Sequence, residues 1–186
     1  MLSTSEFKIG SAIKYNNEQW MITGYQFVNP GKGAAFVRTK LKNLKSGKVL
    51  EVTFKSGEKV EEVDLMYRTL QYLYKDANAY YFMDQDYNQH FLTNEIIGER
   101  SKFFKENMEV KGIVIEDNLS DIVLPMKLDF KVIEAPPGVK GDTATGGSKP
   151  IVIETGATIN APLFIKEGDV IRINTETEEY VERVNQ

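Results

Sequence analysis

Lys32 is the residue of this sequence best placed to do chemistry, because a glycine stands on each side of it in Pro30-Gly31-Lys32-Gly33. Glycine permits positive φ and proline stiffens the entry to a turn, so these residues predict a tight loop between two strands. Such a loop presents one primary amine at its tip. That amine suits insertion into a crevice or modification by an enzyme, and a merely solubilising lysine at a hairpin tip fits equally well.

The lysine loop begins a strongly basic stretch. Residues 30–60 have a net charge of +6, whereas the whole chain has a net charge of −4. The basic residues of this stretch are Lys32, Arg38, Lys40, Lys42, Lys45, Lys48, Lys55 and Lys59, against Glu51 and Glu58. A solvated β-surface can have this composition, but the sharper interpretation is a face that binds a polyanion. We expect Arg38, Lys40 and Lys42 to contact RNA.

Two further motifs resemble known binding sites but lack residues that those sites need. Residues 84–95 place acids and amides as a calcium loop does, but Gln89 stands where that loop needs glycine, and no helices flank it. A β-hairpin turn fits better, with His90 as a strand residue. Residues 141–148 resemble a phosphate-binding loop, but Gly147 replaces its lysine and a strand is expected to follow. We predict an exposed loop there, able to contact RNA backbone.

The composition excludes most enzyme chemistry. The chain has no cysteine and one histidine, so disulfides, thiolate metal sites, a cysteine nucleophile and a His-His zinc site are ruled out. No second histidine or orienting group supports a serine–histidine–acid triad. No apolar run is long enough to span a membrane, and the first ten residues, MLSTSEFKIG, lack the apolar stretch expected of a signal peptide. We expect a soluble, cytoplasmic, monomeric protein with no metal and no bound cofactor.

The elements that must position these residues are mostly strands, because apolar residues alternate with a period of two. We predict an all-β fold of three small β-barrel domains, 1–64, 65–127 and 128–186. The expected strands are 12–15, 19–27, 34–43, 49–54 and 59–65 in the first domain, 71–75, 79–84, 89–92, 109–115 and 121–125 in the second, and 129–135, 151–153, 159–165, 169–174 and 180–184 in the third.

One helix is predicted, over residues 99–107, preceded by a short turn that Thr93 or Asn94 caps and Gly98 ends. Its apolar edge would be Phe103 and Phe104. These rings, and the pair Tyr80-Tyr81, are most simply half-buried packing residues. The alternative is that aromatic side chains stack on unpaired bases, as they do on oligonucleotide-binding barrels.

Four separated motifs resemble the bacterial elongation factor P family. They are FVNPGKGAAFVRTKLKNLKSGKVLEVTFKSGEKV, LQYLYKDANAYYFMD, PPGVKGDTATGGSKP and TGATINAPLFIKEGDVIRINTETEEYVERV, in that order over nearly the whole chain. The resemblance implies an SH3-like, KOW-type first domain followed by two OB-fold domains. It further implies a translation factor, not an enzyme, that binds the ribosome between the P and E sites and rescues stalling at consecutive prolines.

The resemblance also implies roles for particular residues. Lys32 would be the tip lysine that reaches towards the peptidyl-transferase centre beside peptidyl-tRNA, often after covalent extension by a modifying enzyme. Because the tip carries lysine, arginine rhamnosylation is excluded, and a β-lysyl-type extension, another amine extension or no modification stay open. In the third domain, Gly141, Asp142 and Thr143 match a loop near the E-site codon on the small subunit, and Tyr180 and Arg183 match a C-terminal Y-V-x-R pattern.

This sequence departs from the family pattern at Ala161, usually valine, and at Glu179, usually glycine, with Glu178 also acidic. Three rival interpretations stay open. One is a generic OB-fold protein that binds single-stranded RNA without the ribosome. The second is a metal-dependent enzyme built on residues 84–95, and the third is the hypusine-containing initiation factor, which normally has two domains. Membrane and DNA are not expected partners.

Overall fold

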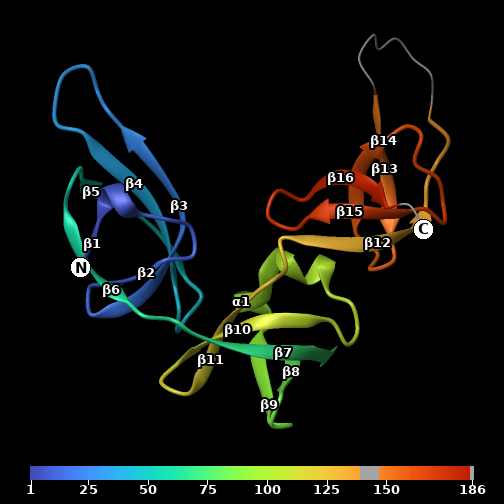
Figure 1. Cartoon of the computed structure of the whole chain (residues 1–186), viewed down its shortest axis with the longest axis horizontal. Coiled ribbons are helices and arrows are strands. Elements are labelled where there is room, and N and C mark those ends of the chain that lie inside the picture. The colour runs from blue at the N-terminus through green and yellow to red at the C-terminus, as the bar shows by residue number, and fades with distance from the viewer. Residues whose placement is uncertain (139–146, 185–186) are drawn as a thin grey trace. The chain divides into compact units, whose positions relative to one another are not determined.

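The computed structural model describes residues 1–138 and 147–184 and consists largely of β-strands (Figure 1). Three sheets are present in these residues, one of six strands and two of five. The chain divides into two compact units. Met1–Arg68, Leu92–Ile96 and Gly112–Asp121 form the first, and Thr69–Phe91, Ile97–Lys111 and Ile122–Gln186 form the second. No helix in the described ranges is long and apolar enough to cross a membrane.

The first sheet has the strand order β1-β6-β2-β3-β4-β5. Its strands are β1 (Leu2–Ser3), β2 (Ala12–Tyr15), β3 (Glu18–Val28), β4 (Phe36–Asn43), β5 (Val49–Lys55) and β6 (Lys59–Val63). A short 3₁₀ turn, η1 (Thr4–Glu6), follows β1, and Ser3 and Glu6 cap it reciprocally. This turn and β1 were not predicted, because two or three residues carry no periodicity.

Alternation along β4 separates a core face from an outer face. Val37, Thr39 and Leu41 are buried, while Arg38 and Lys40 between them are exposed. Val37 and Leu41 belong to one apolar cluster, together with Phe7, Ile13, Trp20, Ile22, Phe54 and Val60. Strands β3 and β4 pair antiparallel from Trp20↔Asn43 to Val28↔Phe36, with one irregularity near Gly24. The pairing carries the hairpin out to the loop that contains Lys32.

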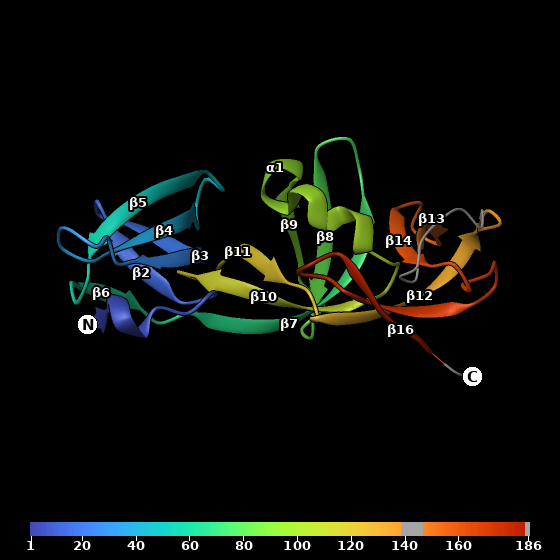
Figure 2. The same cartoon turned by 90° about the horizontal axis from the view of Figure 1, so that it is seen from above.

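The second sheet has the order β11-β10-β7-β8-β9, and Figure 2 shows β7 beside β10. Its strands are β7 (Met66–Lys75), β8 (Ala79–Asp84), β9 (Gln89–Thr93), β10 (Glu109–Ile115) and β11 (Asn118–Val123). Strand β7 is twice as long as the predicted strand over 71–75, because it starts at Met66. The other four predicted strands of this block are confirmed within three residues at each end.

The helix predicted over 99–107 is wrong. The structure has one turn of α-helix, α1 (Asn94–Ile97), and then a 3₁₀ segment, η2 (Gly98–Phe103), after which the chain becomes extended at Phe104. Gly98 has φ +55° and ends α1, as expected. The two consecutive rings then enter different cores: Phe103 packs against Phe130, and Phe104 against Tyr72. Burial of each ring in its own core outweighs the weak preference of so short a segment for a regular helix.

The third sheet has the order β14-β13-β12-β15-β16. Its strands are β12 (Lys127–Glu134), β13 (Ser148–Ile153), β14 (Thr158–Pro162), β15 (Val170–Asn174) and β16 (Glu179–Val184). Fully buried isoleucines at 151, 153, 165, 171 and 173 form most of its core, together with Phe103, Phe130 and Val132. Strand β13 begins at Ser148, the last residue of the segment 141–148, so the predicted strand, rather than a phosphate-binding helix, is confirmed there.

Candidate functional site

Lys32 lies at an exposed bend between β3 and β4. Gly33 has φ +122°, a conformation that side chains rarely adopt, so glycine is needed at this position. Gly31 has no such φ, and a Cβ there would meet nothing within 4 Å. Within the described residues no ion pair involves Lys32. The loop therefore presents the amine on a narrow tip, as predicted from its four residues.

The outer face of the first sheet carries the predicted basic residues near this loop. Arg38 is half-exposed, with its Nε 3.8 Å from Glu51 Oε1 and its guanidinium 6.0 Å from the centre of the Phe36 ring. Lys40 lies opposite Gly24 on β3 and Glu51 on β5. Surface pairs of this length contribute little stability, so Arg38 and Lys40 are available to a polyanion.

Lys42 differs from Arg38 and Lys40, although it continues the same alternation on β4. Its side chain is only 16% exposed, and its Nζ lies 2.9 Å from Asp121 Oδ2 and 2.9 Å from the carbonyl oxygen of Ile96. Asp121 is itself only 4% exposed. The expectation that Lys42 lies on the open basic face is therefore corrected: its ammonium group binds α1 and β11 within the chain. Period-two alternation alone could not reveal this, because Asp121 is distant in sequence.

The predicted residues of the third sheet are only partly described. Gly141, Asp142 and Thr143 lie outside the described residues. Arg183 on β16 has its Nη1 3.9 Å from Asp169 Oδ2 and its guanidinium 5.6 Å from the centre of the Phe164 ring. Tyr180, also on β16, is half-buried against the sheet core.

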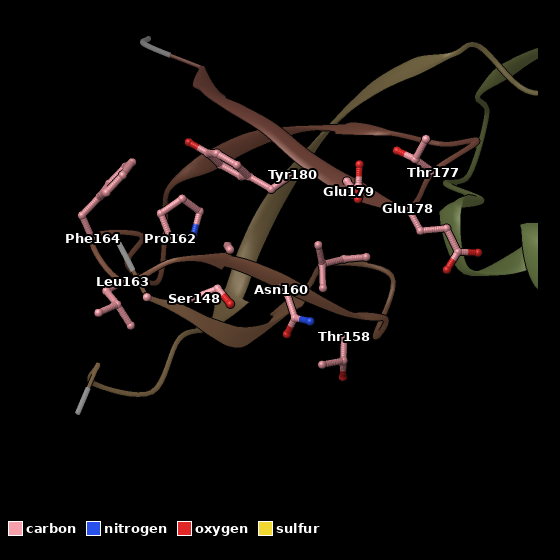
Figure 3. A pocket seen from close by; sticks show the side chains of 13 residues that line it. Ser148, Thr158, Asn160, Pro162, Leu163, Phe164, Thr177, Glu178, Glu179 and Tyr180 are labelled. Atoms are coloured by element: carbon pink, nitrogen blue, oxygen red, sulfur yellow. The ribbon is translucent and has the colours of Figure 1, made fainter. Parts of the chain in front are cut away.

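Tyr180 also lines an open cavity of about 970 Å³ (Figure 3). In Figure 3, Phe164 and Tyr180 lie towards one end, and Thr177 and Glu178 lie towards the other. The family departures Ala161, Glu178 and Glu179 all line this cavity. The residue with left-handed backbone in the β15–β16 turn is Glu178, at φ +62°, so position 178, rather than 179, is the one that favours glycine conformationally.

The acidic segment at residues 84–95 forms the predicted hairpin turn between β8 and β9. Asp84 Oδ1 accepts hydrogen bonds from the backbone amides of Asp86 and Asn88, both at 2.9 Å. His90 lies on β9, as expected, and its Nε2 is 2.9 Å from Asp84 Oδ2. No cluster of three metal-ligating side chains occurs in the described part of the chain. Sequence reasoning missed the carboxylate that orients His90.

The Asp84–His90 contact predicts an acid-sensitive contribution to stability. The hydrogen bond from His90, with those from Asn88 and Asp86, lowers the pKa of Asp84 from 3.8 to about 2. A folded pKa below the unfolded value stabilises the fold above pH 4, and this contribution is lost as the pH falls towards 2. We expect Asp84→Asn to lower the urea midpoint at pH 6 and to approach wild type between pH 4 and 2. The control is Asp86→Asn, at an exposed position. If the urea midpoints of wild type and Asp84→Asn changed in parallel with pH, the prediction would be contradicted.

Three family models match consecutive parts of this chain. Residues 3–60 match the elongation factor P KOW-like domain, residues 65–122 match the elongation factor P OB domain, and residues 128–183 match the model described as elongation factor P, C-terminal. The predicted all-β fold, with a KOW-like first domain followed by an OB domain, is confirmed. That the third domain is also an OB fold stays a prediction. The exact domain boundaries at 64/65 and 127/128 stay a prediction.

Curated relatives match over nearly their full length. Elongation factor P of Natranaerobius thermophilus is 47% identical over 185 residues, which cover 99% of this chain and 98% of that protein. Elongation factor P of Moorella thermoacetica is 46% identical over 184 residues, covering 98% and 100%. Among solved structures, translation initiation factor 5A from Methanococcus jannaschii has 21% identity and covers 66% of this chain and 92% of that one, with a TM-score of 0.42, too low to carry an argument.

The matched KOW-like and OB domains are those of a translation factor. The relatives that match over nearly their full length show which family of translation factors this is. The chain belongs to the elongation factor P family, and its role is that of a translation elongation factor.

Proposed function

We propose that this factor binds the ribosome between the P and E sites and stabilises P-site peptidyl-tRNA, so that peptide bonds form at consecutive prolines. The observation that carries the proposal is the position of Lys32. It lies exposed on a narrow glycine-flanked tip, at the end of a paired hairpin, in a chain of the elongation factor P family. A tip of this form fits a confined space such as the surroundings of the peptidyl-transferase centre.

The chemistry in this proposal belongs to the ribosome, and the factor is not an enzyme. Proline reacts poorly because its ring restricts the backbone around the bond that forms. A factor that holds the tRNA end and the nascent chain in a reactive geometry lowers the barrier without contributing a catalytic group. Each recovery of about 1.4 kcal/mol accelerates the step roughly tenfold.

Lys32 is also the proposed site of covalent extension. Its amine is exposed and no neighbouring side chain within the described residues pairs with it, so a modifying enzyme can reach it. A β-lysyl-type or other amine extension would lengthen the reach of the tip while keeping a positive charge. Intact mass and peptide mass spectrometry of protein purified from its own host would detect the extension.

The basic outer face of the first sheet is proposed to follow the phosphates of ribosome-bound tRNA and rRNA. Arg38 and Lys40 lie on β4, the strand that follows the Lys32 loop, so the same hairpin supplies both the tip and the phosphate contacts. In the third domain, Gly141, Asp142 and Thr143, which lie outside the described residues, are proposed to contact RNA near the E-site codon on the small subunit. Tyr180 and Arg183 are proposed to bind RNA as well.

The experiment that tests the proposal is peptide synthesis through three consecutive prolines on purified ribosomes, with and without the factor. We expect a clear acceleration that a proline-free message does not show. The factor should be purified from its own host, so that any extension of Lys32 is present. If this preparation gives no acceleration, the proposed function is wrong, and a generic RNA-binding role fits the chain better.

Neutralising the basic face should flatten the salt dependence of ribosome binding. For Arg38→Gln/Lys40→Gln we expect weaker binding, because each lost phosphate contact reduces the slope of log affinity against log salt by about 0.7 to 0.9. The measurement is binding to purified ribosomes at four or five salt concentrations. Lys127→Gln/Lys131→Gln, which removes two exposed charges from β12, is the matched control. An unchanged slope in the first variant would show that this face does not contact RNA.

A further inference from the structure

Three aromatic side chains lie on the outer face of the second sheet, one on each of three neighbouring strands. Tyr74 is on β7, Tyr81 on β8 and Phe91 on β9. Tyr74 is 51% exposed, Phe91 is 61% exposed and Tyr81 is half-buried. The neighbours of Tyr81 on β8, Tyr80 and Phe82, point into the core. We call these three rings the aromatic platform.

The rings of the platform are held in place before any ligand arrives. Tyr74 and Tyr81 face each other across the β7–β8 ladder, with ring centres 4.7 Å apart and ring planes 20° apart. Phe91 follows, with its ring centre 6.3 Å from that of Tyr81. The Tyr81 hydroxyl donates a 2.8 Å hydrogen bond to Asp76 Oδ2, and Gln89 Nε2 donates a 3.2 Å hydrogen bond to the Tyr74 hydroxyl.

The charges around the platform suit a ligand with an uncharged, planar centre. Gln71 and Met83 form a cross-strand pair on the same face, and neither is charged. Asp76, an acid at the edge of the platform, already accepts hydrogen bonds from Tyr81 and from two backbone amides. That hydrogen bonding lowers the pKa of Asp76.

We propose that the aromatic platform binds unpaired RNA bases by stacking. Every base has a π-face that stacks on an aromatic ring, and amide side chains such as Gln71 and Gln89 can hydrogen-bond base edges. The location supports this ligand, because OB folds bind oligonucleotides on the face of their second and third strands. Strands β8 and β9 are the second and third strands of the segment that matches the OB family model.

The area of the platform favours bases over a protein partner. A fully buried aromatic side chain removes about 200 Å² from water, so two rings that are more than half-exposed and one that is largely covered offer no more than about 300 Å². A stable protein complex needs roughly 800 Å² from each partner. One to three stacked bases need no more than the platform supplies. The proposal does not depend on the proposed function, since it concerns RNA binding by the free factor.

The test uses the full chain and six-nucleotide oligouridylate and oligoadenylate, without ribosomes. Aromatic NMR signals of Tyr74, Tyr81 and Phe91 are expected to shift on titration, and tripolyphosphate is expected not to displace the oligonucleotides. In Tyr81→Leu/Phe91→Leu, which keeps apolar area but removes two rings, we expect at least a tenfold loss of affinity. Tyr67→Leu is the matched control, because Tyr67 lies on the same strand β7 as Tyr74 and is 53% exposed.

The outcomes separate the ligand classes. Shifts confined to the platform rings, with a loss in the double variant but not in the control, support stacking. Equal affinity of the double variant, displacement by tripolyphosphate, or shifts confined to the basic face of β4 would each overturn the proposal. Absence of binding at millimolar oligonucleotide would overturn it as well and would leave a protein partner as the better account. The wild-type shifts do not depend on whether the variant folds.

Discussion

Lys32→Ala is expected to abolish the acceleration of peptide synthesis through consecutive prolines while leaving the fold intact. The side chain lies on an exposed bend, and no ion pair within the described residues holds it, so its removal should change the free energy of unfolding by less than about 0.5 kcal/mol. The loss of function should be near complete, because the proposed tip contact is made by this one amine. Two quantities are measured for wild type and Lys32→Ala: the rate of peptide synthesis through three consecutive prolines, and the free energy of unfolding in urea.

Two variants make this result specific. Lys48→Ala removes another exposed lysine, from the connection between β4 and β5, and this variant should accelerate synthesis as wild type does. Lys32→Arg keeps a positive charge but cannot accept an amine extension. Partial activity of this variant would therefore show how much of the acceleration comes from the charge and how much from the modification. If Lys32→Ala accelerated synthesis as well as wild type, the tip-lysine mechanism would be wrong for this factor. Ribosome binding of Lys32→Ala should persist, because the basic face is unchanged.

Asp121→Ala is expected to cause the largest loss of stability among the charged residues discussed. It would leave the largely buried ammonium of Lys42 without its carboxylate 2.9 Å away, although Ile96 would still accept one hydrogen bond. Removing one partner of a buried ion pair costs about 3 kcal/mol, because the other charge stays desolvated. Urea unfolding followed by the fluorescence of Trp20, the single tryptophan, measures this loss within the first sheet.

The matched controls are a double variant and a surface pair. Lys42→Met/Asp121→Leu removes both charges and keeps apolar volume, so it should recover most of the stability lost in Asp121→Ala. Glu51→Ala breaks the Arg38–Glu51 contact, in which both side chains are about half-exposed, and should cost under 1 kcal/mol. A loss in Asp121→Ala no greater than that in Glu51→Ala would show that Lys42 reaches water when its partner is removed.

The Lys42–Asp121 pair also bears on function. Strand β4 carries the Lys32 loop at one end and Lys42 near the other, and Lys42 binds β11 and the end of α1. A pair of this kind holds the hairpin against residues that follow much later in the chain. We therefore expect Asp121→Ala to slow peptide synthesis through consecutive prolines more than Glu51→Ala does.

Features that depend only on residues close together in the chain could be predicted from the sequence. Alternation with a period of two predicts strands and their buried faces, because successive side chains of a strand point to opposite sides. It therefore placed β2, β8 and β10 at their observed residues and put Arg38 and Lys40 on an outer face. Glycine and proline predict turns through their own backbone preferences, so the exposed Lys32 loop could also be predicted from the sequence.

Tertiary structure alone decided which of these side chains meet. Lys42 has the same local pattern as Lys40, yet its charge is bound internally, because Asp121 arrives from a strand far along the chain. Phe103 and Phe104 suggested one helical edge, but two separate cores compete for their rings, and burial outweighs a short helix propensity. The platform of Tyr74, Tyr81 and Phe91 likewise exists only through strand register, because no local spacing sets which residues of three strands lie side by side.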